Sequence, residues 1–189
     1  MYALKKFGIE ETDRTKLYKF IGPPLTESFE KFYGFTKEQS LDGVKYYREY
    51  YHDKGIYENR VYDGLEEVLK KINEAGKQAI VATSKPEKYA KIIIDHFHLT
   101  QYFACVAGME MDGGRGTKAQ VITYALEKND ITDKSNVLMI GDREHDVIGA
   151  HENGLDCLGI LYGFGSRKEF EEAGADYIRE NVEDILQFV

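Results

Sequence analysis

The sequence contains no tryptophan, only three prolines and only two cysteines among its 189 residues. Cys105 and Cys157 both lie in apolar, strand-like runs, so neither a disulfide framework nor a cysteine metal site is predicted. No apolar run approaches the roughly 20 residues of a membrane span, and the first residues do not resemble a secretory signal. We therefore expect two buried, reduced thiols in a cytoplasmic protein with no membrane-bound part.

Positive charge is also scarce. The chain has 33 acidic against 25 basic residues, a net charge of -8, and no stripe of basic side chains. Proteins that bind nucleic acid use such stripes to contact the phosphate backbone. A nucleic acid partner is therefore not expected, although a single nucleotide is not excluded as a ligand.

From Val61 onward, short apolar runs alternate with amphipathic stretches. Strands are predicted at residues 78–83, 103–107, 137–140 and 157–162. Helices are predicted at residues 63–75, 87–96, 117–128, 146–153 and 182–188. Strands that alternate with helices of about ten residues are typical of a parallel sheet with right-handed crossovers. The predicted fold class is therefore α/β.

The first third of the chain is instead helical and rich in aromatic residues. Helices are predicted at residues 2–7, 15–20, 27–33 and 36–51. Thr26 is the expected N-cap of the helix at 27–33, because its side chain can accept a hydrogen bond from a free amide, and Thr36 is expected to start the last helix. The run Gly22-Pro23-Pro24 forms a stiff kink, since proline is excluded from helix interiors.

The most informative stretch surrounds Gly141. The apolar residues 137–140 end there, and Asp142 stands at the carboxyl end of the predicted strand, where open α/β sheets bind ligands. Asp146 follows four residues later, within reach if the chain turns directly into a helix. Two converging carboxylates make a hard-oxygen site of the kind that Mg²⁺ accepts. The alternative is that Asp142 caps the helix and Asp146 is solvated in its first turn.

Two further polar groups follow other strands. Thr83 and Ser84 end a strand just before a helix whose free N–H groups favour an anion, which predicts a phosphate site. Either hydroxyl also suits a simple N-cap, and Pro86 is expected in the first helical turn. Lys118 starts a helix after a glycine-rich run. A cation there opposes the helix dipole and needs an anionic partner.

A hydroxyl, a lysine and an acid pair, in that order after successive strands, resemble the haloacid dehalogenase superfamily of phosphohydrolases. Residues 81–87 resemble its second motif, Lys118 its third, and residues 139–146 its fourth. The resemblance covers essentially the whole chain. It implies a Rossmann-like parallel sheet core at residues 60–189.

The resemblance also assigns the remaining segments. Residues 1–59 resemble the family's small α-helical cap, incomplete at its amino end, and Gly22, Pro23 and Pro24 resemble the cap loop that faces substrate. Residues 159–165 and 173–177 resemble the phosphoglycolate phosphatase-like branch.

The chemistry that the resemblance implies is Mg²⁺-dependent hydrolysis of a small phosphate monoester through a phosphoaspartate. Thr83, with the backbone of Ser84, is implied to hold a phosphoryl oxygen. Lys118 is implied to neutralise the nucleophile and the phosphoryl charge. Asp142 is implied to bind Mg²⁺, and Asp146 to bind the metal or orient its water. Stabilisation of charge by metal and lysine is most of what phosphoryl transfer requires.

The family's first motif, Asp-x-Asp-x-Thr at the end of an opening strand, has no match. No Asp-x-Asp occurs in the sequence, and the nearest look-alike, residues 110–113, follows the wrong strand. In the family the opening strand lies between those ending here at Thr83 and Ile140. Without it several buried backbone groups stay unpaired, at about 1–3 kcal/mol each. We expect that the sequence begins at an internal methionine or is a fragment; a strand from a second copy is the less favoured alternative.

Two functional hypotheses follow. The first is a phosphatase whose sequence is short at its amino end, acting as a monomer or homodimer on a small phosphorylated metabolite. The second is a catalytically inactive relative that binds phosphate or metal. A phosphomutase or dehalogenase on the same scaffold is a third, looser interpretation. The sequence leaves phosphoglycolate, a sugar phosphate and a nucleotide open as substrates.

Overall fold

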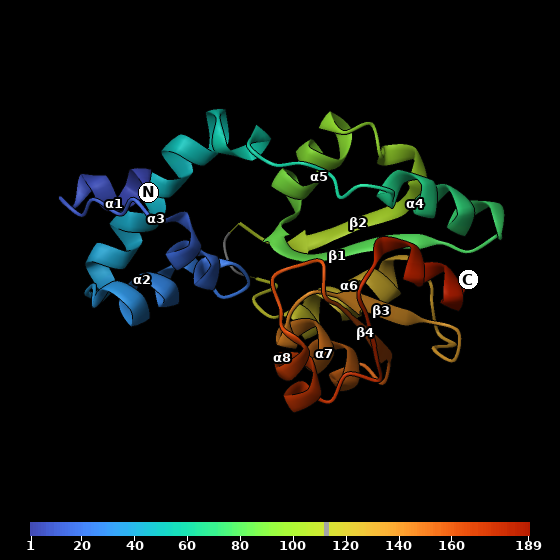
Figure 1. Ribbon diagram of the computed structural model, residues 1–189. Coiled ribbons are helices and arrows are strands. Elements are labelled where there is room, and N and C mark those ends of the chain that lie inside the picture. The colour runs from blue at the N-terminus through green and yellow to red at the C-terminus, as the bar shows by residue number, and fades with distance from the viewer. Residues whose placement is uncertain (112–113) are drawn as a thin grey trace. The chain divides into compact units, whose positions relative to one another are not determined.

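Figure 1 shows a computed structural model of the chain, which describes residues 1–111 and 114–189. Asp112 and Gly113, and with them part of the look-alike at residues 110–113, lie outside the described residues. The chain divides into two compact units, Met1–Asn59 and Arg60–Val189, and each is described by itself. Every described helix is too short or too polar to traverse a lipid bilayer.

The first unit is helical. Its elements are α1 (Tyr2–Lys6), the 3₁₀ helix η1 (Arg14–Phe20), α2 (Leu25–Tyr33), α3 (Lys37–Asp53) and the 3₁₀ helix η2 (Gly55–Tyr57). Aromatic rings fill its core. The buried ring of Phe29 stacks on Phe35 with centroids 5.4 Å apart and meets the ring of Phe20 edge-on at 5.3 Å. Such ring pairs contribute beyond the apolar area that they bury.

The two longer helices of this unit begin differently. Thr36, predicted as the first residue of its helix, is the N-cap of α3: its Oγ1 accepts from Gln39 N while Gln39 Oε1 accepts from Thr36 N. The prediction that Thr26 caps α2 is wrong, since that helix already begins at Leu25, directly after Pro24. Proline lacks an N–H and has a fixed φ, so it suits the position before the first helical residue.

The second unit has the predicted α/β fold with parallel strands. In one sheet β1 (Ala79–Pro86) pairs with β2 (Phe103–Met109). In the other, β3 (Leu138–Gly141), β4 (Asp156–Ile160) and β5 (Tyr177–Arg179) pair in that order. Helices connect the strands, so the carboxyl ends of neighbouring strands lie at the same edge of each sheet, which is where ligands bind in such folds.

The helices of this unit pack on those strands (Figure 1). They are α4 (Leu65–Glu74), α5 (Glu87–His96), α6 (Lys118–Lys128), α7 (Glu144–Glu152) and α8 (Arg167–Ala173), with 3₁₀ helices η3 (Thr100–Tyr102) and η4 (Val182–Phe188). Both α5 and α6 contact β1 and β2, whereas α7 contacts β3 and β4. The core around α7 includes the fully buried Val147, Cys157 and Phe170. Cys105 and Cys157 are free and buried, as predicted.

One edge of each sheet is incompletely covered. Among the described residues β1 pairs only with β2, and β3 pairs only with β4 and with no other strand. All of β1 and residues 138–140 of β3 are half-buried, although both strands are largely apolar; residues 157–160 of β4 are buried. β1 and β3 therefore each present a partly exposed apolar edge.

Three local predictions need correction. β1 continues past Thr83 to Pro86, which pairs with Met109 after a break in register. Pro86 is therefore the extended N-cap of α5 and not part of its first turn. The sequence analysis missed α8 and β5, which are too short to show a periodic pattern. Finally, residues 182–188 form a 3₁₀ helix.

Candidate active site

The chain turns sharply from β3 into α7, and Asp146 holds the turn together. Its Oδ2 accepts hydrogen bonds from the amides of Asp142 and Arg143, each at 3.0 Å. Gly141 is required here, because a Cβ would lie 2.2 Å from Asp146 Cβ. Asp146 is 5% exposed and the N-cap of α7 is Arg143. The alternative in which Asp142 caps the helix and Asp146 is solvated is therefore wrong.

Lys118 joins three elements at this point. It is the first residue of α6, and its Nζ lies 2.7 Å from Asp146 Oδ1 and donates to Ala82 O at 2.9 Å. Ala82 is the neighbour of Thr83 in β1. Asp146 thus supplies the anion that a lysine at a helix N-terminus needs. The pair also brings the predicted lysine, acid pair and hydroxyl into one place.

Asp142 is held by the loop that follows β4. Its Oδ2 accepts from Phe164 N at 3.0 Å, and a Cβ on Gly163 would lie 2.3 Å from Asp142 Cβ. Burial raises the pKa of Asp142, and the charge of Asp146 adds to the shift. A desolvated carboxylate beside a second one is stabilised in its charged form by a cation.

Thr83 and Ser84 lie where β1 breaks register before α5. The Thr83 hydroxyl oxygen accepts a hydrogen bond from Lys85 N at 3.1 Å, which leaves its proton to be donated to a ligand. Both residues are half-buried.

The residues at this edge fit Mg²⁺ through Asp142 better than through Asp146. Both oxygens of Asp146 are already engaged, Oδ1 by Lys118 and Oδ2 by two amides. The described residues contain no group of three or more histidine, cysteine, aspartate or glutamate side chains arranged to hold a metal. Mg²⁺ is usually bound by only one or two carboxylates, with waters and substrate phosphate completing its shell. Mg²⁺ binding by Asp142 and Asp146 remains a prediction.

Two residues that the sequence analysis did not single out support the site. Glu169 of α8 accepts from Arg143 Nε and from Glu144 N, each at 2.8 Å, and so fixes the turn after β3. Although burial opposes it, the Arg143 guanidinium and the Glu144 amide hold the pKa of Glu169 below its usual value. Glu169 lies on the helix that the sequence analysis missed.

The second supporting residue is Arg115, in the loop before Lys118. It donates to Gly108 O at 3.0 Å and to Glu87 Oε2 at 3.2 Å, and its guanidinium lies 3.9 Å from the centre of the Tyr124 ring. It therefore ties this loop to the end of β2 and to the first residue of α5. The sequence feature that could have indicated this role is the position of Arg115 in a run of glycines.

Gly22, Pro23 and Pro24 lie between η1 and α2 in the first unit, where Gly22 has a φ of 109°. That this loop faces substrate remains a prediction.

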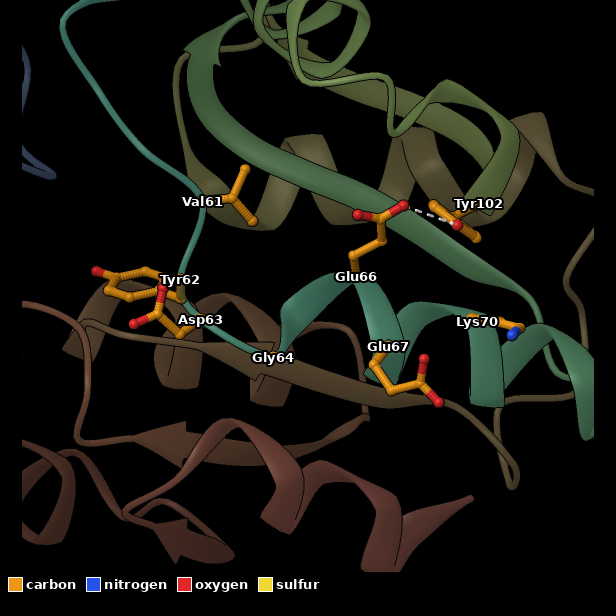
Figure 2. A pocket seen from close by; sticks show the side chains of 8 residues that line it. All are labelled: Val61, Tyr62, Asp63, Gly64, Glu66, Glu67, Lys70 and Tyr102. Atoms are coloured by element: carbon orange, nitrogen blue, oxygen red, sulfur yellow. Dashed lines mark hydrogen bonds between the residues drawn. The ribbon is translucent and has the colours of Figure 1, made fainter.

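Figure 2 shows a hollow of about 670 Å³ elsewhere in the second unit. It is lined by Val61, Tyr62, Asp63, Gly64, Glu66, Glu67, Lys70 and Tyr102. The Tyr102 hydroxyl donates to Glu66 Oε1 across it at 3.1 Å. None of the predicted site residues lines this hollow, but its residue Tyr62 lies near Asp142, because burial and the charge of Asp142 both raise the pKa of Tyr62.

Comparisons with known proteins show the family of this chain. The family described as haloacid dehalogenase-like hydrolase matches residues 1–160. The 5′-nucleotidase of Pseudomonas aeruginosa is 42% identical over 168 residues, which are 89% of this chain and 76% of that protein. The tyrosine-protein kinase PtkA of Mycobacterium tuberculosis is 32% identical over 87% of this chain, which spans only 55% of PtkA.

More distant relatives include phosphoglycolate phosphatases of Vibrio species, at 22% identity. Among solved structures, that of a predicted phosphatase from Clostridium acetobutylicum has a TM-score of 0.93 and 45% identity, over 98% of this chain and 86% of that one.

Proposed function

Because the chain belongs to the haloacid dehalogenase-like hydrolases, we propose that it hydrolyses a small phosphate monoester with Mg²⁺ as cofactor. One observation carries the proposal: Lys118 Nζ meets Asp146 Oδ1 at 2.7 Å and the carbonyl of Ala82, the residue before Thr83, at 2.9 Å. The contact of Lys118 with β1 and α7 supports a phosphoryl site that uses this cation, the Thr83 hydroxyl and the Asp142 carboxylate.

The chain's own residues divide the work. Thr83 donates a hydrogen bond from its hydroxyl to a phosphoryl oxygen, and the backbone at Ser84 helps to hold that oxygen. Lys118 places positive charge beside the phosphoryl group, and Asp146 orients that lysine. Asp142 holds Mg²⁺, which supplies further positive charge on the phosphoryl oxygens when bound.

The first substrate to test is a nucleoside 5′-monophosphate, because a relative at 42% identity carries the name 5′-nucleotidase. Phosphoglycolate is the second, because phosphoglycolate phosphatases are more distant relatives.

The nucleophile is proposed to lie on a strand outside these 189 residues, paired between β1 and β3. The half-buried apolar edges of both strands and the lack of any Asp-x-Asp in the sequence support this. The test is the intact mass of the protein from its natural source. A mass distinctly above 21.7 kDa is expected, and a mass of 21.7 kDa would contradict a nucleophile carried by the same polypeptide.

The competing proposal is a non-catalytic relative that binds phosphate, which the absence of Asp-x-Asp favours. Phosphate release from adenosine 5′-monophosphate and from phosphoglycolate, with Mg²⁺, separates the two. We expect the natural protein to release phosphate and Asp142→Asn to lose that activity. Asp156→Asn, an exposed aspartate at the start of β4, is the matched control. Phosphate binding without turnover would support the competing proposal, and neither binding nor turnover would overturn both.

A further inference from the structure

The first turn of α6 lies unusually close to α7. A Cβ on Gly149 of α7 would lie 2.8 Å from Lys118 Cγ and 3.0 Å from Ala119 N. The stem of Lys118 therefore rests directly on the backbone of α7. Contact this close needs a directional restraint on the distance between the two helices and on their relative shift along the helix axes. Apolar packing alone does not supply one, because it is not directional.

Asn153, directly after α7, provides that restraint. It is 9% exposed, and its Nδ2 donates to Ala119 O at 3.0 Å and to Gly149 O at 2.9 Å. Its Oδ1 accepts from Thr123 Oγ1 at 2.7 Å. A buried amide is favourable only when its hydrogen bonds are satisfied, and here both its donor and its acceptor are used between the two helices. The side chain thus links the first turn of α6 to the last turn of α7.

We propose that Asn153 is a positioning residue for Lys118. Ala119, whose carbonyl it holds, is the next residue after Lys118, and Gly149 lies one turn after Asp146 on α7. By holding these two carbonyls, Asn153 sets the separation at which Lys118 Nζ spans from α6 to Asp146 Oδ1 and Ala82 O. The role of Lys118 toward a phosphoryl group rests on the proposed function. The positioning of Lys118 by the hydrogen bonds of Asn153, called the clamp below, does not rest on it.

The experiment measures how fast each lysine is acetylated by a limiting amount of acetic anhydride, residue by residue, by mass spectrometry. Lys118 has only 11% of its side chain exposed and is hydrogen bonded, so it is expected to react slowly. In Asn153→Ala we expect Lys118 to react about 5- to 30-fold faster, because one or two lost hydrogen bonds raise the population of the open form by that factor. Lys85, a half-buried lysine of β1, is the internal reference.

Two variants accompany this one. Glu152→Ala changes the exposed neighbour of Asn153 and is expected to leave Lys118 unchanged. Thr123→Val removes the hydroxyl that donates to Asn153 Oδ1 and also lies 3.0 Å from Ala119 O, but it keeps both bonds of Asn153 Nδ2. A smaller acceleration at Lys118 is expected, and this variant tests the proposal if Asn153→Ala does not fold. Equal acceleration at Lys85 and Lys118 would mean general loosening and would overturn the proposal. So would an unchanged rate at Lys118 in a folded Asn153→Ala protein.

The same assay with inorganic phosphate and Mg²⁺ tests the proposed function separately. Protection of Lys118 by phosphate is expected in the unmodified protein. Absence of protection would count against the phosphate site, whereas the clamp would still stand or fall by the rates measured without phosphate.

Discussion

The two units bury polar groups in opposite ways. In the second unit, Asp146 and Asn153 are buried and use their side-chain oxygens and nitrogens in several hydrogen bonds each. In the first unit, the hydroxyls of Ser28 and Ser40 are buried without a hydrogen-bond partner among the described residues. The first unit relies on aromatic packing, which is less directional than hydrogen bonding. The second uses directional bonds at the place where charged groups must meet at fixed distances.

The largest change in the free energy of unfolding is expected when a buried polar group of the second unit is removed. Asp146→Ala leaves Lys118 without its anion and two amides without an acceptor. Removing one partner of a buried ion pair costs about 3–5 kcal/mol, so we expect a loss of that size in the free energy of unfolding measured in urea. Asp156→Ala, at an exposed position, is the control and should change it by less than about 0.5 kcal/mol. A loss below about 1 kcal/mol in Asp146→Ala would show that the pair does not support the fold.

A second comparison uses two equivalent capping boxes, Thr36 with Gln39 in the first unit and Thr117 with Gln120 in the second. Thr36→Ala and Thr117→Ala should each cost about 1 kcal/mol of stability, because each removes an N-cap. Only Thr117→Ala is expected to accelerate acetylation of Lys118, since that cap begins the helix that carries the lysine.

Thr26→Ala is the control for this pair, because Thr26 lies inside α2 and is expected to matter little. If Thr36→Ala accelerated the acetylation of Lys118 as much as Thr117→Ala does, the effect would not be specific to the helix that carries Lys118.

The unpartnered hydroxyls of the first unit allow a smaller test. Ser28→Ala and Ser40→Ala should leave the free energy of unfolding unchanged or raise it by up to about 1 kcal/mol, because a buried hydroxyl without a partner is desolvated for no gain. Urea denaturation followed by circular dichroism measures the change. A clear loss in either variant would mean that these hydroxyls are bonded and that the contrast between the units is wrong.

The smallest expected effect concerns Asp142, which is half-buried and keeps an amide bond. Because its pKa is raised on folding, the native state binds its proton more tightly than the unfolded state does. Its contribution to stability is therefore favourable below the usual aspartate pKa and is lost as pH rises through the folded-state value. Asp142→Asn should raise the urea midpoint slightly at pH 7, and the gain should vanish at about pH 3. A gain that persists at low pH would point to a cause other than the charge.

The alternation of strands and helices was readable from the sequence because the longer helices show their period and the four predicted strands are short apolar runs between them. Thr36 and Thr117 were predicted as first helical residues and are the N-caps, so both helix starts were predicted to within one residue. α8 and β5 were missed because seven and three residues do not reveal a period. Thr26 was misassigned because the prolines before it already start the helix.

The site was foreseen only in part, for the same reason. Lys118 and Asp146 each follow a strand, so their approach follows from parallel topology. Glu169, Phe164 and Asn153 act through contacts made across the fold, on Asp142, Arg143 and the α6–α7 pair. No local sequence pattern predicts such contacts, because they depend on how α7, α8 and the loop after β4 pack in the folded second unit.

The open edges of β1 and β3 also affect the self-association of the protein in solution. An unpaired apolar strand edge is a template on which another chain can add a strand, and natural proteins guard against this with charge, proline or a covering segment. β1 has its only charge, Lys85, and its only proline at its last two positions, and residues 138–140 of β3 carry no charge. Self-association that grows with protein concentration is therefore the expected hazard for these 189 residues on their own, and a net charge of -8 is the main force that opposes it.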